Sequence, residues 1–154
     1  MSAARPWLLV LLLVALPHGV WAQALPRSFY EAFPGFGHAW VSGDGPCNEH
    51  LLRHFGGLNV AFAVVMLCAL VRPTRELVRA AALATLVGGV PHFAYHAAHL
   101  DLLPSRTDAV VQTTTLTIPV VVALALPRTP APVQRRLSSV LAKVHPEDSL
   151  EAVS

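Results

Sequence analysis

Four blocks of apolar residues, each about long enough to cross a bilayer as a helix, constrain the fold of this chain more than any other feature. They cover residues 6–25, 51–71, 77–100 and 109–126. Only 13% of the 154 residues are charged and 54% are apolar, which is far from an ordinary soluble or disordered composition. The sequence therefore predicts an all-α membrane protein built as a bundle of four transmembrane helices.

The segments outside these blocks predict one long loop and a tail. Residues 26–50 are rich in aromatic residues, glycines and prolines, which predicts a long aromatic outer loop that folds back on the bilayer or caps the bundle. We assign residues 1–127 to the transmembrane domain and residues 128–154 to a cytoplasmic tail. Apolar residues in the tail recur at helical spacing among basic ones, which predicts a short amphipathic helix on the membrane surface. A disordered tail is the alternative.

The first apolar block has two interpretations. Arg5, Pro17 and the small residues around Gln23 also fit a cleavable signal peptide over residues 1–24. Because the apolar character continues to Leu25, the block is long enough to be retained as a span.

The distribution of basic residues predicts the orientation of the chain in the membrane. Eight lysines and arginines flank one side of the spans and three flank the other. The eight are Arg5, Arg72, Arg75, Arg79, Arg128, Arg135, Arg136 and Lys143; the three are Arg27, Arg53 and Arg106. We therefore predict a protein of the cell inner (plasma) membrane. The positive-inside rule then places both of its termini in the cytoplasm. The basic residues are too dispersed to indicate nucleic-acid binding. The predicted partners are the lipid bilayer and either another membrane protein or a second copy of the chain.

Histidines gather at the predicted outer ends of two successive spans. His92, His96 and His99 are spaced by four and three residues, so a helix presents them on one narrow face. His50 and His54 have the same one-turn spacing at the start of the second span. The two spans are joined by a short turn, so we expect them to be antiparallel neighbours whose histidines face each other.

These five histidines predict a metal site, with alternatives. Together with Glu49 or Asp101 they form a nitrogen and oxygen ligand set suited to zinc, copper or iron. Paired imidazoles from facing helices also suit a haem. Histidines at a membrane interface can instead bond only water, headgroups and loop carbonyls, or act in pH sensing.

Smaller motifs give further expectations about packing. Gly56 and Gly57 predict a close approach of two helix backbones, and Ser105 with Asp108 has the spacing of a helix N-terminal capping box. The threonine-rich stretch 113–117 predicts hydroxyl bonds to backbone carbonyls freed by the following Pro119.

The arrangement of motifs from Trp21 to Leu100 resembles a family of uncharacterised small integral membrane proteins, chiefly of actinobacteria. The matching motifs are Pro26-Arg27-Ser28-Phe29-Tyr30, Phe33-Pro34-Gly35-x-Gly37, Trp40-Val41, Gly45-Pro46-x-Asn48-Glu49-His50-Leu51, Gly56-Gly57-Leu58-Asn59 and Pro91-His92-x-x-Tyr95-His96-x-x-His99-Leu100. The resemblance implies four spans with the first one retained, and it implies no activity.

From these features we predict a non-enzymatic small membrane subunit or binding module with a histidine-rich outer site. Two alternatives are a metal- or haem-dependent membrane oxidoreductase and a proton-coupled small transporter. The chain shows no phosphate-binding loop and no dinucleotide-binding fingerprint.

Overall fold

The structure, a computed structural model, describes residues 3–126. Four of its helices are long and apolar enough to cross a membrane: α1 (Arg5–Ala24), α3 (Glu49–Val71), α4 (Arg75–Ala98) and α5 (Arg106–Ala125). The prediction of an all-α chain with four such helices is confirmed. The amphipathic helix predicted within residues 128–154 lies outside the described residues.

Helices α3, α4 and α5 each begin two or three residues before the apolar block that predicted them. The reason is capping by the polar residues that precede the blocks. The side-chain oxygens of Asn48, Thr74 and Ser105 accept the backbone N–H three residues further on, at 3.0, 3.2 and 3.1 Å. The capped first turn is polar, so hydropathy alone places these boundaries too late.

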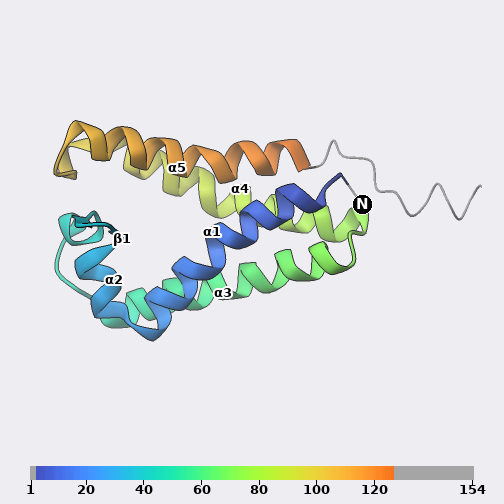
Figure 1. Ribbon diagram of the computed structural model, residues 1–154, viewed down its shortest axis with the longest axis horizontal. Coiled ribbons are helices and arrows are strands. Elements are labelled where there is room, and N and C mark those ends of the chain that lie inside the picture. Colours follow the sequence, from blue (N-terminus) through green and yellow to red (C-terminus); the bar gives the residue numbers. More distant parts are fainter. Residues whose placement is uncertain (1–2, 127–154) are drawn as a thin grey trace, which may run out of the picture.

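The long helices form two pairs (Figure 1). α1 packs along α3 and α5 packs along α4, and the pairs are joined by packing of α3 on α4. The start of α1, the α3–α4 turn and the last turn of α5 lie at one end of the molecule, here called the tail end. The segment between α1 and α3 lies at the other end, here called the cap end.

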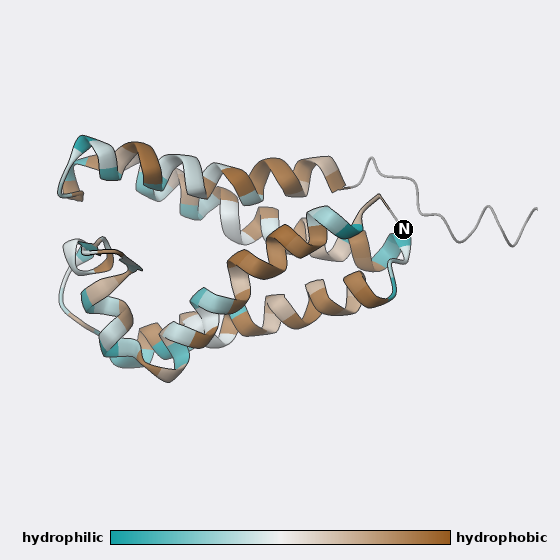
Figure 2. Cartoon of the chain, viewed as in Figure 1, coloured by the Kyte–Doolittle hydropathy of each residue, from teal (hydrophilic) through white to brown (hydrophobic). Residues whose placement is uncertain are grey.

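The buried core is concentrated toward the tail end. Most of its members lie in the tail-end halves of the four long helices or directly flank them: Ala4, Leu8, Leu11, Ala15, Ala63, Met66, Ala69, Val78, Ala81, Ala82, Val122, Ala123 and Leu126. No residue of α4 beyond Ala82 is buried. Figure 2 shows that apolar residues dominate the tail-end half of α5 and much of α1 and α3, and that hydrophilic residues are more frequent toward the cap end. Apolar side chains that face outward on such helices suit contact with lipid.

A close backbone contact joins α1 to α3. A Cβ atom added at Gly56 would lie 2.4 Å from the backbone nitrogen of Gln23 and 2.7 Å from the carbonyl oxygen of Gly19. Around Gly57 the nearest atom is the side-chain nitrogen of Gln23 at 3.7 Å. The close approach predicted for the glycine pair therefore occurs at Gly56, because Gly56 faces α1.

The segment between α1 and α3 is more ordered than the predicted loop over residues 26–50. It contains α2 (Pro26–Ala32), a hairpin of β1 (Pro34–Gly35) and β2 (His38–Ala39), and the short helix η1 (Val41–Asp44). Proline at the first position of α2 starts that helix, and two glycines with positive φ shape the hairpin turn. Residues 26–44 are called the cap below.

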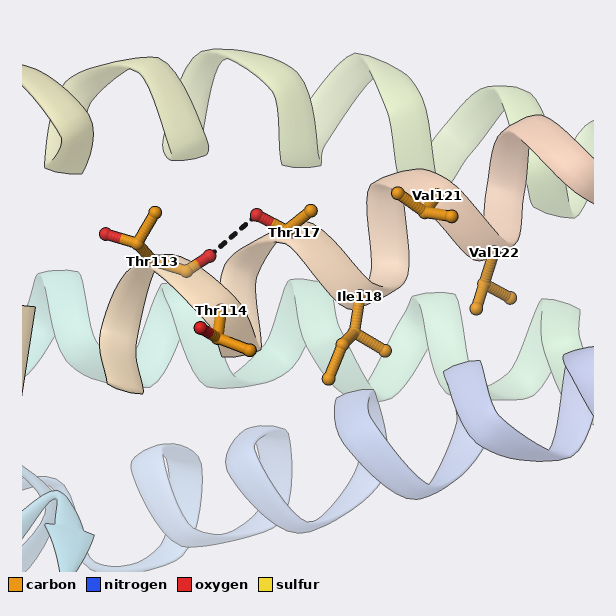
Figure 3. Close-up of a pocket in the computed structure, with 6 residues that line it drawn as sticks. All are labelled: Thr113, Thr114, Thr117, Ile118, Val121 and Val122. Atoms are coloured by element: carbon orange, nitrogen blue, oxygen red, sulfur yellow. Dashed lines mark hydrogen bonds between the residues drawn. The ribbon is translucent and has the colours of Figure 1, made fainter. Parts of the chain in front are cut away.

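A shallow open groove of about 430 Å³ follows α5 (Figure 3). It is lined by Thr113, Thr114, Thr117, Ile118, Val121 and Val122. The hydroxyls of the three threonines donate to the carbonyls of residues 109, 110 and 113, each one turn earlier in α5, at 2.7 Å. Pro119 has no N–H, so it leaves the carbonyl of Thr115 without its helical donor. The three hydroxyls bond earlier carbonyls instead, so the prediction that they bond a carbonyl freed by Pro119 is wrong for these three. Their methyl groups remain to line the groove.

Candidate functional site at the capped end

Two polar side chains are buried in the part of the chain that the structure describes, and both belong to α5. Asp108 and Gln112 lie one helical turn apart with residue exposures of 4% and 5%. The side-chain oxygen Oε1 of Gln112 is buried without a hydrogen-bond partner. Buried polar side chains are few in a folded protein, and they usually have a structural or a functional role. These two residues therefore define the candidate site.

Asp108 is held at the start of α5 by the predicted capping motif. The Ser105 hydroxyl accepts the backbone N–H of Asp108 at 3.1 Å and donates to the Asp108 carboxylate oxygen Oδ2 at 2.5 Å. The helix start expected near Ser105 is confirmed. A carboxylate in the first turn is also favoured by the helix dipole.

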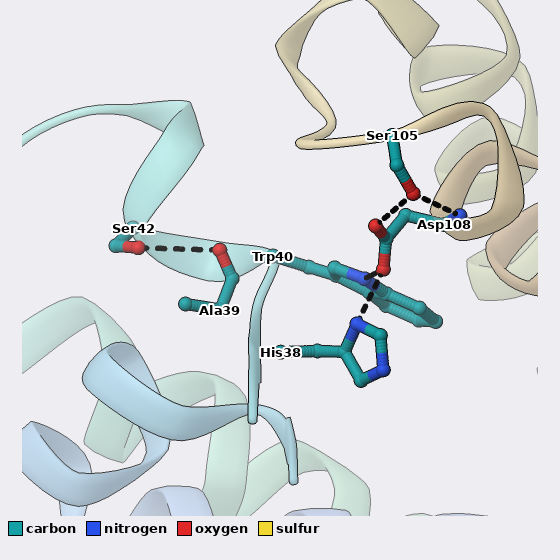
Figure 4. Close-up of polar contacts among 6 residues, drawn as sticks. All are labelled: His38, Ala39, Trp40, Ser42, Ser105 and Asp108. Atoms are coloured by element: carbon teal, nitrogen blue, oxygen red, sulfur yellow. Dashed lines mark hydrogen bonds and ion pairs between the residues drawn. The ribbon is translucent and has the colours of Figure 1, made fainter. Parts of the chain in front are cut away.

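The other carboxylate oxygen of Asp108 receives two donors from the cap (Figure 4). The indole Nε1–H of Trp40 donates to Oδ1 at 2.7 Å, and the imidazole Nδ1 of His38 lies 2.6 Å from the same oxygen. Trp40 is 7% exposed, whereas 45% of the His38 side chain is exposed. One carboxylate on α5 therefore fastens two side chains of the hairpin, one buried and one open to solvent.

The hairpin is aimed at Asp108 by contacts inside the cap. The backbone N–H of Trp40 donates to the carbonyl of Phe33 at 2.8 Å, and their rings lie 6.0 Å apart. The Phe33 ring also contacts Phe29 of α2 at 4.6 Å, which joins the hairpin to that helix. His38 in β2 and Trp40, which directly follows that strand, both reach Asp108.

The cap also contacts the connection between α4 and α5. A Cβ atom added at Gly43 of η1 would lie 2.9 Å from the carbonyl oxygen of Leu102, in the short helix η2 (Leu100–Leu102). The cap thus lies against the first turn of α5 and against the segment that leads into it.

The histidines predicted as metal ligands are placed separately. The rings of His92 and His96 pack edge to face at 4.6 Å, and both interact electrostatically with Asp44 of the cap. The Nδ1 of His99 lies 2.7 Å from the carbonyl of Tyr95 and its ring stacks on Tyr95, while the imidazole also interacts electrostatically with His96.

The predicted ligands on α3 are on the surface. His50 and His54 are exposed, and Glu49 lies 3.8 Å from Arg53 on the same helix. Arg53 also donates to the carbonyl of Gln23 at 2.7 Å.

Within residues 3–126, no three side chains of the histidine, cysteine, aspartate and glutamate types are grouped so that they could hold a metal ion. The structure therefore does not gather the predicted six-residue ligand set. Two of the six predicted ligands have other partners, since His99 lies against the Tyr95 carbonyl and Glu49 lies 3.8 Å from Arg53. Binding of a metal or haem by His92 and His96 stays a prediction, which the metal content and absorption spectrum of the purified protein check.

The sequence interpretation missed His38 and underused Trp40. One signal was available: a turn of glycines at positions 35 and 37 precedes His38-Ala39-Trp40, a pattern typical of a short hairpin with two side chains on one face. Nothing in the sequence pattern indicated that this face meets Asp108, 68 residues later in the chain.

Comparisons of the chain with protein-family models, with curated proteins and with solved structures find no match. The resemblance carried by the motifs between Trp21 and Leu100 stays a prediction.

Proposed function

We propose that this chain is a multi-pass inner-membrane protein, with both termini cytoplasmic and the cap on the outer face, and that it serves as a small non-enzymatic subunit or binding module. The four long apolar helices and the excess of basic residues that flank one side of the spans in the sequence support the topology. The core contacts of α1 support its retention, since removal of residues 1–24 would take Leu8 and Leu11 from the core.

The observation that carries a binding function is Phe36, at the tip of the hairpin. Its relative exposure is 100%, and its backbone has φ +57°, between Gly35 and Gly37, which also have positive φ. A phenylalanine rarely adopts this left-handed backbone conformation, and such outliers are concentrated at functional sites. Aromatic side chains, phenylalanine among them, are also enriched in the cores of protein interfaces. We therefore assign Phe36 as the anchor for an apolar pocket on a partner protein at the membrane surface.

Replacement of Phe36 by asparagine is expected to separate binding from stability. Asparagine tolerates positive φ, so the unfolding temperature should stay the same or rise, while the partner loses its aromatic anchor. Loss of such an anchor typically weakens an interface by about 2 kcal/mol, or roughly thirtyfold in affinity. The measurement is the fraction of protein in a larger native assembly after mild detergent extraction of its own membranes.

Leu51→Ala is the matched control, because Leu51 is also an exposed apolar residue near the cap end, at 60% exposure. It should leave the assembly intact. Two outcomes would contradict the proposed role of Phe36. One is an assembly that stays the same size in Phe36→Asn, and the other is a wild-type protein that migrates without a partner.

The proposed topology can be tested with the two cysteines of the chain. Cys47 lies near the cap end and Cys68 lies one turn before the other end of α3, and both are free and exposed. A membrane-impermeant maleimide should label Cys47 in intact cells carrying Cys68→Ser. A chain with Cys47→Ser, Cys68→Ser and Glu76→Cys should be labelled only after permeabilisation, because Glu76 lies in the α3–α4 turn region. The reverse pattern would invert the proposed orientation.

A further inference from the structure

We propose that the cap-end parts of α4 and α5 form a hinged arm that the cap holds closed, so that release of Asp108 lets the arm move away from α1 and α3. The arm is residues 91–118, which comprise α4 from Pro91 onward, η2, and α5 as far as Ile118. This motion does not depend on the proposed role of Phe36, because it can be measured in the purified protein without any partner.

Both helices of the arm carry a proline at its base. Pro91 lies inside α4 and Pro119 lies inside α5. Neither proline has an N–H, so in each helix the carbonyl four residues earlier loses its helical donor. The two prolines lie at about the same level of the α4–α5 pair, since a Cβ atom added at Gly89 would lie 3.4 Å from the Cγ2 of Val120. Helices bend sharply at such prolines, so the pair can bend at one level.

Two glycines of α4 add flexibility at this level. A Cβ atom added at Gly88 would lie 3.7 Å from the Phe62 ring, and one added at Gly89 would meet Val120 at 3.4 Å, which are ordinary contacts. Packing therefore does not require a glycine at either position. A glycine inside a helix leaves the backbone more freedom than alanine does, so the pair makes α4 easier to bend here.

The apolar core of α4 and α5 lies on the tail side of this hinge. Its members in these two helices are Val78, Ala81, Ala82, Val122 and Ala123. Within residues 91–118, all of which the structure describes, the buried residues are Asp108 and Gln112. The arm thus has little buried apolar surface to keep it closed, and parts of a fold with little burial open at low cost.

The two buried residues of the arm have opposite effects on closure. Asp108 accepts the Trp40 N–H at 2.7 Å and lies 2.6 Å from the His38 Nδ1, so both side chains of the cap hold the arm (Figure 4). The Oε1 of Gln112 is buried without a hydrogen-bond partner. A buried acceptor without a donor is costly, and water can satisfy it once the arm opens. The closed arm therefore depends on its bonds to the cap.

Double electron–electron resonance between pairs of spin labels measures the opening in detergent micelles. In a chain whose two cysteines are replaced by serine, Leu51→Cys on α3 and Val110→Cys on α5 place one pair of labels toward the cap end. Leu67→Cys on α3 and Leu124→Cys on α5 place a second pair on the tail side of the hinge. All four residues are exposed, so the labels leave the core intact.

Asp108→Ala removes the acceptor that holds the arm. The wild type should give one narrow distance distribution at the cap end, and Asp108→Ala should add a population at longer distance. The ratio of open to closed molecules should rise about tenfold, as expected for loss of a hydrogen bond to a charged group. The tail-side distance should stay the same. If Asp108→Ala does not fold, His38→Ala with Trp40→Phe removes the same bonds from the cap and carries the test.

Gly88→Ala with Gly89→Ala, added to Asp108→Ala, should lower this ratio about threefold or more, because alanine stiffens the hinge. Gly57→Ala is the matched control, since it changes a loosely packed glycine of α3 outside the hinge, and it should leave the ratio unchanged. Three outcomes would overturn the hinged arm. They are equal cap-end distributions in the wild type and the variant that releases the cap, opening that the double glycine substitution does not reduce, and a tail-side distance that lengthens as well.

Discussion

Trp40→Ala is expected to destabilise the folded cap by about 3–5 kcal/mol, the usual range for removing a buried large aromatic side chain. Trp40 is 7% exposed, its ring contacts Phe33 at 6.0 Å, and its N–H donates to Asp108. The substitution thus removes the packing of the hairpin and one of the bonds that hold it to α5. Hydrogen exchange of the backbone amides of the cap is the direct measurement, and the amides of α1 and α3 should change far less.

Two controls separate the contributions of the Trp40 ring and its N–H group. Trp40→Phe keeps a buried aromatic ring but loses the donor to Asp108 and part of the indole volume, so a smaller loss of about 1–3 kcal/mol is expected. Trp7→Ala removes an indole that is 41% exposed on α1, and it should leave cap exchange unchanged. Exchange rates in the cap that match the wild type after Trp40→Ala would mean that Trp40 does not hold the cap.

Gly56→Ala is expected to destabilise the packing of α1 on α3 by about 3 kcal/mol, the upper end of the usual range for overpacking. The added methyl group would meet the backbone of Gln23 at 2.4 Å and that of Gly19 at 2.7 Å. Both contacts are with backbone atoms, so no side-chain rotation can relieve them and the helices must separate. Reversible unfolding of the purified protein in micelles, followed by far-ultraviolet circular dichroism, measures the change in the free energy of unfolding.

The neighbouring glycine provides a matched control with the opposite expected sign. Gly57→Ala meets only the flexible end of the Gln23 side chain, at 3.7 Å. In a helix interior, alanine is favoured over glycine by about 0.5–1 kcal/mol, so this variant should be slightly more stable than the wild type. Equal effects of the two substitutions would show that α1 does not approach α3 at Gly56.

Hydropathy and capping predicted the long helices because both depend on neighbours in the sequence. The apolar blocks located the helices, and the Ser105–Asp108 spacing predicted a helix start near the observed Arg106, although the predicted span began at residue 109. The pattern placed the starts of α3 and α4 too late, because their first turns are polar and are held by the Asn48 and Thr74 caps. Local hydrogen bonds of this kind are readable once a capping residue is given weight equal to hydropathy.

The candidate site was less predictable because its members are distant in the chain. Helical spacing placed His92 and His96 side by side, as the 4.6 Å ring contact shows. The same spacing could not reveal that His99 bonds the Tyr95 carbonyl, or that Asp44 lies near the pair. Periodicity determines which side chains of a helix lie on the same face. Which residues lie opposite that face depends on how separate elements pack.

By itself, the sequence determined that four long apolar helices form and that polar and titratable groups gather near their ends, since composition and short-range spacing set both. Only the tertiary structure decided that residues 26–44 fold into a cap and that His38 and Trp40 meet Asp108. The physical reason is that a buried carboxylate needs donors, and the donors come from a segment brought near only when α1 packs on α3 and α4 on α5.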